Sequence, residues 1–156
     1  MIHDQHANAL ERFVTAQAQP YGGYADALAE MRAGAKHSHW MWYIFPQRRG
    51  LGSSEMAIYY GIADDAEAIA YLHHPILGSR LAEVTHWVAH HLATIEARVL
   101  MGSHIDVLKL GSCMQLFGTI SAQLTDASEP WIVTLRHDCA QVLQLLNAQG
   151  HTTPSA

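Results

Sequence analysis

The chain has 156 residues and a mass of 17.2 kDa, which suits one domain with a sizeable hydrophobic core. A net charge of −5 and a pI of about 6.1 exclude the broad basic face that generic nucleic-acid binding requires. Charged residues make up only 15%, against about 25% in an average soluble protein, and twelve histidines partly fill this deficit. Of the nine basic residues only two are lysines, Lys36 and Lys109, and both lie in dense polar clusters.

Apolar residues recur at helical spacing along most of the chain. A first helix is expected to end before Pro20, and a second runs from about Tyr24 to a stop at Gly34. Further helical patterns follow from residue 55 onward. The longest of them begins at Pro75 and ends at Gly102.

Two more helical patterns complete the chain, over residues 106–124 and from Pro130 to Leu146. Strand signals are nearly absent. The sequence therefore predicts one all-α domain of about six or seven helices over residues 1–150. A short polar, flexible tail is expected over residues 151–156.

The segment from Trp40 to Phe45 consists entirely of large apolar or aromatic residues. Periodicity does not separate a buried strand from a short buried helix over so few residues. Ser38 is placed to cap a helix that Pro46 would end, and this favours the helix.

Nothing in the sequence indicates export or membrane insertion. The amino-terminal residues have neither a basic nor an apolar signal region, and no apolar run approaches about eighteen residues. We therefore expect a cytoplasmic protein without membrane contact. Cys113 and Cys139 lie in separate apolar helical patterns without zinc spacing, which predicts buried free thiols.

Both lysines have polar neighbours that could make them functional. Asp106, Lys109 and Ser112 share one face of a helix, so Asp106 and Lys109 can pair at i, i+3. An ordinary ion pair is one reading. The other is that the chain, which uses arginine elsewhere, needs a compact, tunable ammonium group at Lys36 and at Lys109.

The loop after Pro46 contains two arginines, two glycines and two serines, over residues 48–54. Arg48, Gly50, Gly52 and Ser54 would bring positive charge, open backbone N–H groups and a hydroxyl to one point. This chemistry suits a carboxylate or a phosphate. The alternative is a tight turn with its arginines in solvent, because the motif is far shorter than a P-loop.

Trp40 and Trp42 point about 200° apart if the segment is helical, so the two rings cannot both face the same interior. Core packing is the ordinary role of such rings. The ring left outside the core could line a cleft and stack a heterocyclic base, with Gln47 reading the polar edge of the base.

Histidine spacing gives little support to a metal site. His86 and His90 lie at i, i+4, and His37 and His39 form a second pair, but neither pair has an obvious third ligand. The sequence predicts neither a metal nor a cofactor. His39 and His74 have distinctive neighbours and could act as general bases near neutral pH.

Several of these segments resemble one known family. They are the Lys36–Gln47 run containing Ser-His-Trp-Met-Trp, Gly50-Leu51-Gly52, the stretch from Tyr71 through His74 and Arg80 to Leu81, and Asp106–Phe117. Together they resemble an uncharacterised bacterial domain-of-unknown-function family whose members are often labelled calpastatin. The resemblance implies a compact helical fold and no established activity. Calpastatin itself is a disordered protein, whereas this composition describes a globule.

The chain departs from that family pattern at two places. Gln115 stands where the family has threonine, and the last helix around Asp138 keeps little of the family ending.

Two functional hypotheses follow. The first is a cleft that binds a small anionic ligand, phosphate- or nucleotide-like, by simple binding or with acid–base chemistry. The catalytic candidates are Lys36, His39, Asp106 and Lys109. The ligand-binding candidates are Ser38, Trp40, Trp42, Gln47, Arg48, Gly50, Gly52, Ser54, His74, Arg80 and Ser112. The second hypothesis is a non-enzymatic helical protein–protein interaction module, in which these polar motifs are structural. The sequence does not identify a reaction or an oligomeric state.

Overall fold

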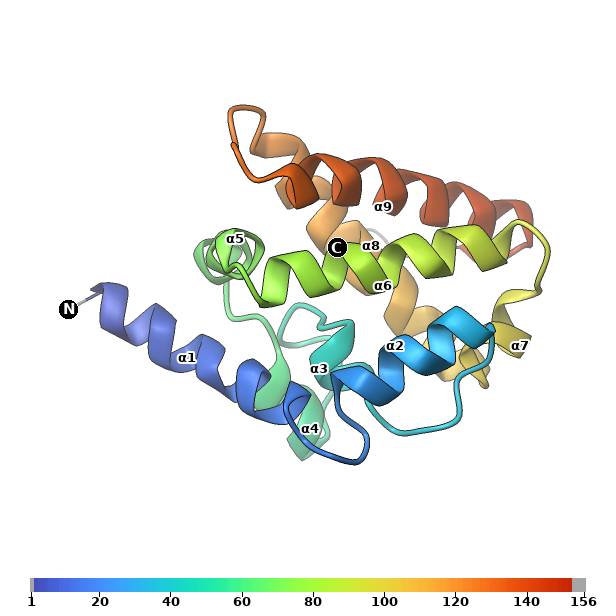
Figure 1. Ribbon diagram of the computed structural model, residues 1–156, viewed down its shortest axis with the longest axis horizontal. Coiled ribbons are helices and arrows are strands. Elements are labelled where there is room, and N and C mark those ends of the chain that lie inside the picture. The colour runs from blue at the N-terminus through green and yellow to red at the C-terminus, as the bar shows by residue number, and fades with distance from the viewer. Residues whose placement is uncertain (1, 153–156) are drawn as a thin grey trace.

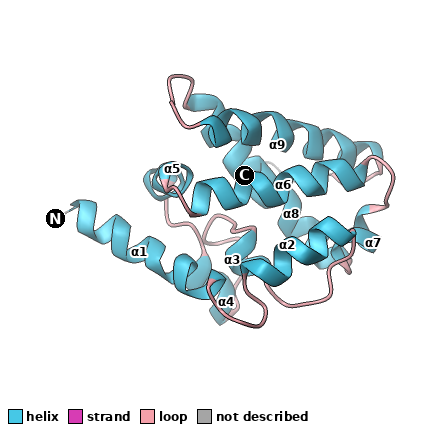
Figure 2. Cartoon of the chain, viewed as in Figure 1, coloured by secondary structure: helices cyan, strands magenta, loops and turns pink. Residues whose placement is uncertain are grey.

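The computed structural model describes residues 2–152, with side chains from residue 9 onward, and within this part the regular secondary structure consists of helices joined by loops, apart from one isolated β-bridge between Arg48 and Ile62 (Figures 1 and 2). The helices are α1 (Ile2–Gln17), α2 (Tyr24–Ala33), α3 (Met41–Ile44), α4 (Glu55–Tyr60), α5 (Asp65–His73), α6 (Leu77–Leu92), α7 (Ala97–Met101), α8 (His104–Gln123) and α9 (Pro130–Ala148). The all-α class is confirmed. The described residues form nine helices instead of six or seven.

One reason for the higher count is that the structure contains two helices, α6 and α7, where the apolar pattern up to Gly102 predicts one. Gln149, at the end of α9, occupies the junction. Its amide nitrogen donates to two carbonyl oxygens at the end of α6 and beyond it, both at 3.1 Å. Its oxygen accepts the Ala97 N–H at 2.8 Å. A residue remote in sequence therefore satisfies the backbone groups that the break exposes.

Helices α6, α8 and α9 form the centre of the domain. Figure 1 shows α9 lying along α6 with α8 behind them, while α2 packs on α6 from the opposite side. Aromatic rings connect the outer helices to this centre. Tyr71 of α5 meets Phe13 of α1 and Phe117 of α8, each with ring centroids 5.2 Å apart. All three rings are fully buried, so they contribute a large share of the apolar stabilisation.

Cys113 and Cys139 are buried free thiols, as their apolar patterns predict. Burial raises the pKa of both thiols, and this keeps them in the unreactive protonated form at neutral pH. They therefore act as small apolar groups between α8 and α9.

The predicted tail begins at residue 151, and His151 itself is buried. Its backbone N–H donates to the Leu146 carbonyl at 2.8 Å, and its Nε2 lies 2.8 Å from a carboxylate oxygen of Glu96. Residues 153–156 of the predicted tail lie outside the described residues.

His74 supports the start of α6. Its Nδ1 accepts the backbone N–H groups of Ile76 and Leu77, each at 3.2 Å. Burial lowers the pKa of His74, and the negative charge of Glu11 opposes this lowering only in part. Acceptance of both N–H groups requires an unprotonated Nδ1. The contribution of His74 to stability is therefore complete above its unfolded pKa of about 6.5 and declines as the pH falls below that value.

We accordingly expect His74→Ala to lower the free energy of unfolding by about 1 kcal/mol at pH 8. The difference between wild type and variant should shrink when urea unfolding is repeated at pH 5. Comparing the two proteins at each pH cancels the titration of the other histidines. A difference that stays constant from pH 8 to pH 5 would contradict this role.

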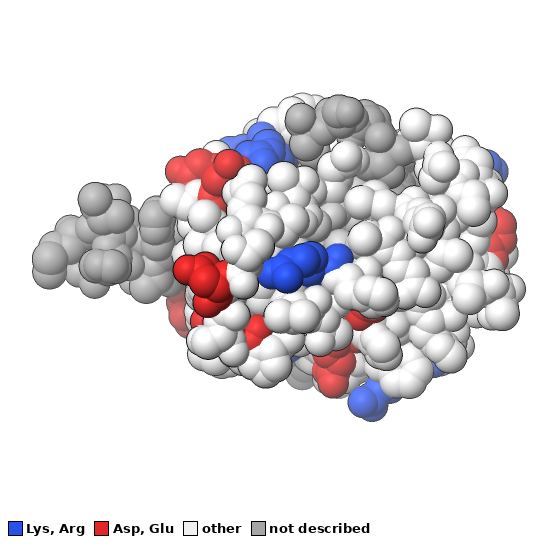
Figure 3. Space-filling model, turned by 90° about the horizontal axis from the view of Figure 1, so that it is seen from above, with Lys and Arg blue, Asp and Glu red and all other residues white. Residues whose placement is uncertain are grey.

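The surface seen in Figure 3 carries its basic side chains apart from one another, without a continuous basic band. Among the described helices, none combines the length and the apolar character needed to cross a lipid bilayer.

Candidate functional site

The segment that follows α2 is held by one carboxylate, that of Glu30. The Glu30 side chain accepts hydrogen bonds from the backbone N–H groups of His37 (2.6 Å) and Ser38 (2.9 Å). It also accepts from the Ser38 hydroxyl at 2.6 Å and from the Trp40 indole N–H at 3.0 Å. Burial alone would raise the pKa of Glu30, but these hydrogen bonds outweigh it and hold the pKa below its ordinary value.

This arrangement corrects the predicted role of Ser38. The segment does contain a short helix, but α3 begins at Met41 with Trp40 at its N-cap position and no side-chain cap, and the Ser38 hydroxyl donates to Glu30 instead. Trp40 is fully buried, whereas Trp42 is only partly buried. His39 is exposed, and its carbonyl accepts the Tyr43 hydroxyl at 3.2 Å.

Lys36 lies beneath the surface and forms a close ion pair with α8. Its Nζ is 2.9 Å from Oδ2 of Asp106, and it donates to the Ser38 carbonyl at 2.6 Å. The same ammonium lies 5.0 Å from the centre of the Trp40 ring. Only 7% of the Lys36 side chain is exposed, so this charge is paired inside the fold.

Lys109 is the more accessible partner of the same carboxylate. Its Nζ is 3.9 Å from Oδ1 of Asp106, which places the i, i+3 pair at the outer limit of an ion pair. The Lys109 ammonium also lies 4.5 Å from the centre of the Trp42 ring, and 23% of its side chain is exposed. Lys36 and Lys109 therefore approach one carboxylate from two sides, and only Lys109 faces outward.

The loop over residues 48–54 is fixed at both ends. The backbone N–H of Arg49 donates to the Ile62 carbonyl and the Ile62 N–H donates to the Gln47 carbonyl, both at 2.8 Å. Gly50 has a φ of +103°, a conformation that favours glycine. At the other end, the Ser54 hydroxyl accepts the Ala57 N–H and caps α4.

Among the described residues, only one of the two arginines predicted to give this loop its positive charge is paired. Arg48 lies 3.1 Å from a carboxylate oxygen of Asp65, and Arg49 is exposed. The sequence could not show this pairing, because Asp65 belongs to the next helix and serves equally well in its first turn.

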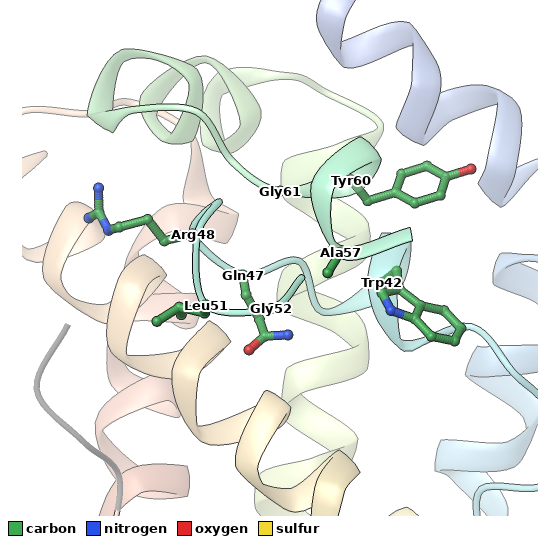
Figure 4. A pocket seen from close by; sticks show the side chains of 8 residues that line it. All are labelled: Trp42, Gln47, Arg48, Leu51, Gly52, Ala57, Tyr60 and Gly61. Carbon is green, nitrogen blue, oxygen red and sulfur yellow. The ribbon is translucent and has the colours of Figure 1, made fainter. Parts of the chain in front are cut away.

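A groove of about 620 Å³ separates this loop and α4 from α8. Its lining residues are Trp42, Gln47, Leu51, Gly52, Ser53, Ser54, Ala57, Ile105, Leu108, Lys109 and Ser112. A recess of about 10 Å³ adjoins it, sharing Trp42, Gln47 and Gly52 among its walls. Figure 4 shows the residues around this recess, with Arg48 and Tyr60 pointing away on opposite sides.

The groove unites six of the predicted site residues. Lys109 supplies a positive charge, Ser54 and Ser112 supply hydroxyls, Gln47 an amide and Trp42 an aromatic ring, with Gly52 in the wall. Polar groups that converge in a concave, partly apolar surface can bind an anion that carries an organic body.

Other predicted residues lie outside this groove. The groove lining does not include Lys36, Asp106, Ser38, Trp40, Gly50, His39 or Arg48. His74 supports the start of α6, as described above.

Arg80, the remaining ligand-binding candidate, packs between helices. It donates to the Gln17 side chain at 3.3 Å and lies 4.7 Å from the Tyr24 ring. It does not line the groove.

Sequence reasoning missed two features of the site. One is Glu30, whose partners lie in an irregular segment that no periodicity describes. The other is the apolar wall, in which Leu51, Ile105 and Leu108 are 55%, 64% and 42% exposed. A signal for part of this wall was present, because Ile105, Leu108 and Ser112 are spaced to share the helix face that carries Lys109.

Among the described residues, no three His, Cys, Asp or Glu side chains lie close enough together to hold a metal ion.

Comparison with known proteins gives a family but no activity. The model of a family described as "Protein of unknown function (DUF1810)" matches residues 7–133. The crystal structure of the conserved hypothetical protein Rv1873 from Mycobacterium tuberculosis is similar, with 42% identity and a TM-score of 0.73. The match covers 90% of this chain and 89% of that one. No protein of curated function matches. The chain therefore belongs to the DUF1810 family of proteins of unknown function.

Proposed function

We propose that the groove between α8 and the loop over residues 48–54 binds a small anionic ligand, phosphate- or nucleotide-like. The observation that carries this proposal is the position of Lys109. Its ammonium lies over the Trp42 ring at the groove wall, and its only carboxylate neighbour among the described residues, Asp106, is 3.9 Å away and closer to Lys36. The positive charge of Lys109 is therefore available to an anion.

The surrounding groups suit such a ligand. Hydroxyls of Ser53 and Ser112 and the amide of Gln47 line the groove and can donate hydrogen bonds to phosphate oxygens. Leu51 and Leu108 offer apolar surface to the rest of the ligand. Of the four catalytic candidates only Lys109 lines the groove, so the proposal is limited to binding.

Lys109→Met tests the proposal. Isothermal titration calorimetry with inorganic phosphate, AMP and cyclic AMP should show binding of at least one of them to the wild type. The variant should bind that compound at least about tenfold more weakly, because a charge-assisted hydrogen bond is lost. Arg98→Gln is the matched control, since it removes one exposed positive charge that does not line the groove.

The same compounds should raise the melting temperature of the wild type and of Arg98→Gln. If none of the three binds the wild type, or if Lys109→Met binds as tightly, the proposed function is wrong.

Contact with a protein partner is a second candidate function, and the outer face of α4 favours it. Met56, Ile58 and Tyr59 are 39%, 53% and 58% exposed and adjoin one another there. Contiguous exposed apolar residues are typical of interaction surfaces. A partner retained by the wild type and lost from Ile58→Ser/Tyr59→Ser in a pull-down would support this function. Equal recovery by both proteins would count against it.

A further inference from the structure

The three charged side chains at the α8 side of the groove do not balance one another. Two ammonium groups, of Lys36 and Lys109, share the single carboxylate of Asp106. Lys36 is the closer partner, at 2.9 Å against 3.9 Å, and the more buried one, with 7% of its side chain exposed against 23%. The formal sum of the three charges is one positive charge, and the geometry leaves it on Lys109.

No other charge lines the groove. Apart from Lys109, its lining residues are all uncharged. Arg48 borders the small recess but is paired with Asp65 at 3.1 Å, so the two together add no net charge. The groove therefore presents one uncompensated positive charge among hydroxyl, amide, apolar and aromatic groups.

We propose that the groove accepts a ligand with one negative charge, a phosphodiester or a carboxylate, attached to an apolar or planar body. We further propose that Lys36, which does not line the groove, sets this limit by neutralising Asp106. Lys36 is thus a positioning residue that acts through Asp106 and Lys109. This inference rests on the proposed function, because it concerns the ligand of the same groove.

The physical reason is the closeness of Asp106 to Lys109, since its Oδ1 lies 3.9 Å from the Lys109 ammonium. A second negative charge on the ligand would meet no second free cation, and the Asp106 carboxylate would repel it. Without the Lys36 charge, Asp106 would instead neutralise Lys109, and any anion would lose its attraction. Without the Asp106 charge, both ammonium groups would act on the ligand, and a doubly charged anion would gain most.

AMP and cyclic AMP are a matched pair of probes for this charge limit. They share base and ribose, but near pH 8 the phosphate of AMP carries about two negative charges and that of cyclic AMP carries one, since the second phosphate pKa is about 6. Dissociation constants for both, measured by calorimetry at pH 8, give a preference ratio for each protein. In the wild type, cyclic AMP should bind at least as tightly as AMP.

Three variants separate the charge effect from a structural one. Lys36→Met should weaken the binding of both nucleotides by roughly tenfold. Asp106→Asn should shift the preference ratio toward AMP by roughly tenfold. The double variant Lys36→Met/Asp106→Asn restores one positive charge at Lys109 and should return the ratio to the wild-type value. A merely structural role for Lys36 predicts no such recovery.

The possible results are distinguishable. Failure of every probe to bind the wild type overturns the proposed function. Wild-type binding that depends on Lys109 but is tighter for AMP than for cyclic AMP overturns only the single-charge limit. Binding to a folded Lys36→Met as tight as to the wild type overturns only the role of Lys36. If Lys36→Met does not fold, Asp106→Asn decides, and an unchanged preference ratio in that variant overturns the inference.

Discussion

Replacing Lys36 with methionine is expected to lower the free energy of unfolding by about 2 kcal/mol. The substitution keeps most of the side-chain volume but leaves Asp106, which is only 16% exposed, without its closest partner. Breaking a buried ion pair from one side costs about 3–5 kcal/mol, and the nearby Lys109 ammonium should offset part of that cost. Urea unfolding monitored by circular dichroism gives the difference directly.

A double-mutant cycle shows whether this cost belongs to the ion pair. Asp106→Asn should also destabilise, because it leaves the buried Lys36 ammonium unpaired. Lys36→Met/Asp106→Asn should be more stable than the sum of the single effects predicts, by at least about 1 kcal/mol. Lys109→Met, at a more exposed position, should cost less than about 1 kcal/mol. Strict additivity of the two single variants would contradict a direct interaction between Lys36 and Asp106.

The cycle concerns a contact that the sequence could not predict. The i, i+3 spacing of Asp106 and Lys109 follows from helix geometry, and both residues lie on α8 as that spacing requires. The tighter contact of Asp106 is with Lys36, which is remote in sequence and lies in a segment without secondary structure. Local periodicity carries no information about such a partner.

The fold shows the same division between local and remote causes. Cys113, Cys139 and the all-α class follow from local apolar patterns, because helix burial obeys the 3.6-residue period. The break between α6 and α7 does not, since the amide that satisfies it belongs to Gln149. A short stretch of sequence does not reveal a hydrogen-bond partner that lies far away along the chain.

Arg80 illustrates the limit for the site. Its position within a family-like motif suggested ligand binding, but the structure shows it hydrogen-bonded to Gln17 of α1 and stacked on Tyr24 of α2. A residue can belong to such a motif because it binds a ligand or because it packs between helices. Only the tertiary structure distinguishes these two roles.

Glu30→Gln is expected to destabilise the protein by about 3 kcal/mol near neutral pH. The Glu30 carboxylate accepts four hydrogen bonds from residues 37, 38 and 40, and an amide side chain would present an N–H to some of these donors. Hydrogen bonds to a charged group contribute about 1.5–3 kcal/mol each, and a donor left unpaired in the interior costs a similar amount. Glu55→Gln, at an exposed position in α4, is the control and should have little effect.

The pH dependence follows from the lowered pKa of Glu30. Because the folded pKa lies below the ordinary value of 4.5, the carboxylate stabilises the fold fully above that value. This stabilisation is lost as the pH falls through the folded pKa, so wild type and Glu30→Gln should converge in stability toward acidic pH. Urea midpoints measured at pH 7 and at a series of pH values below 4.5 test this. Because the hydrogen bonds of Glu30 also hold the chain just before Trp42, Glu30→Gln should weaken any Lys109-dependent binding of nucleotides. A variant that is as stable as wild type and binds as tightly would contradict the role of Glu30 in holding the segment before Trp42.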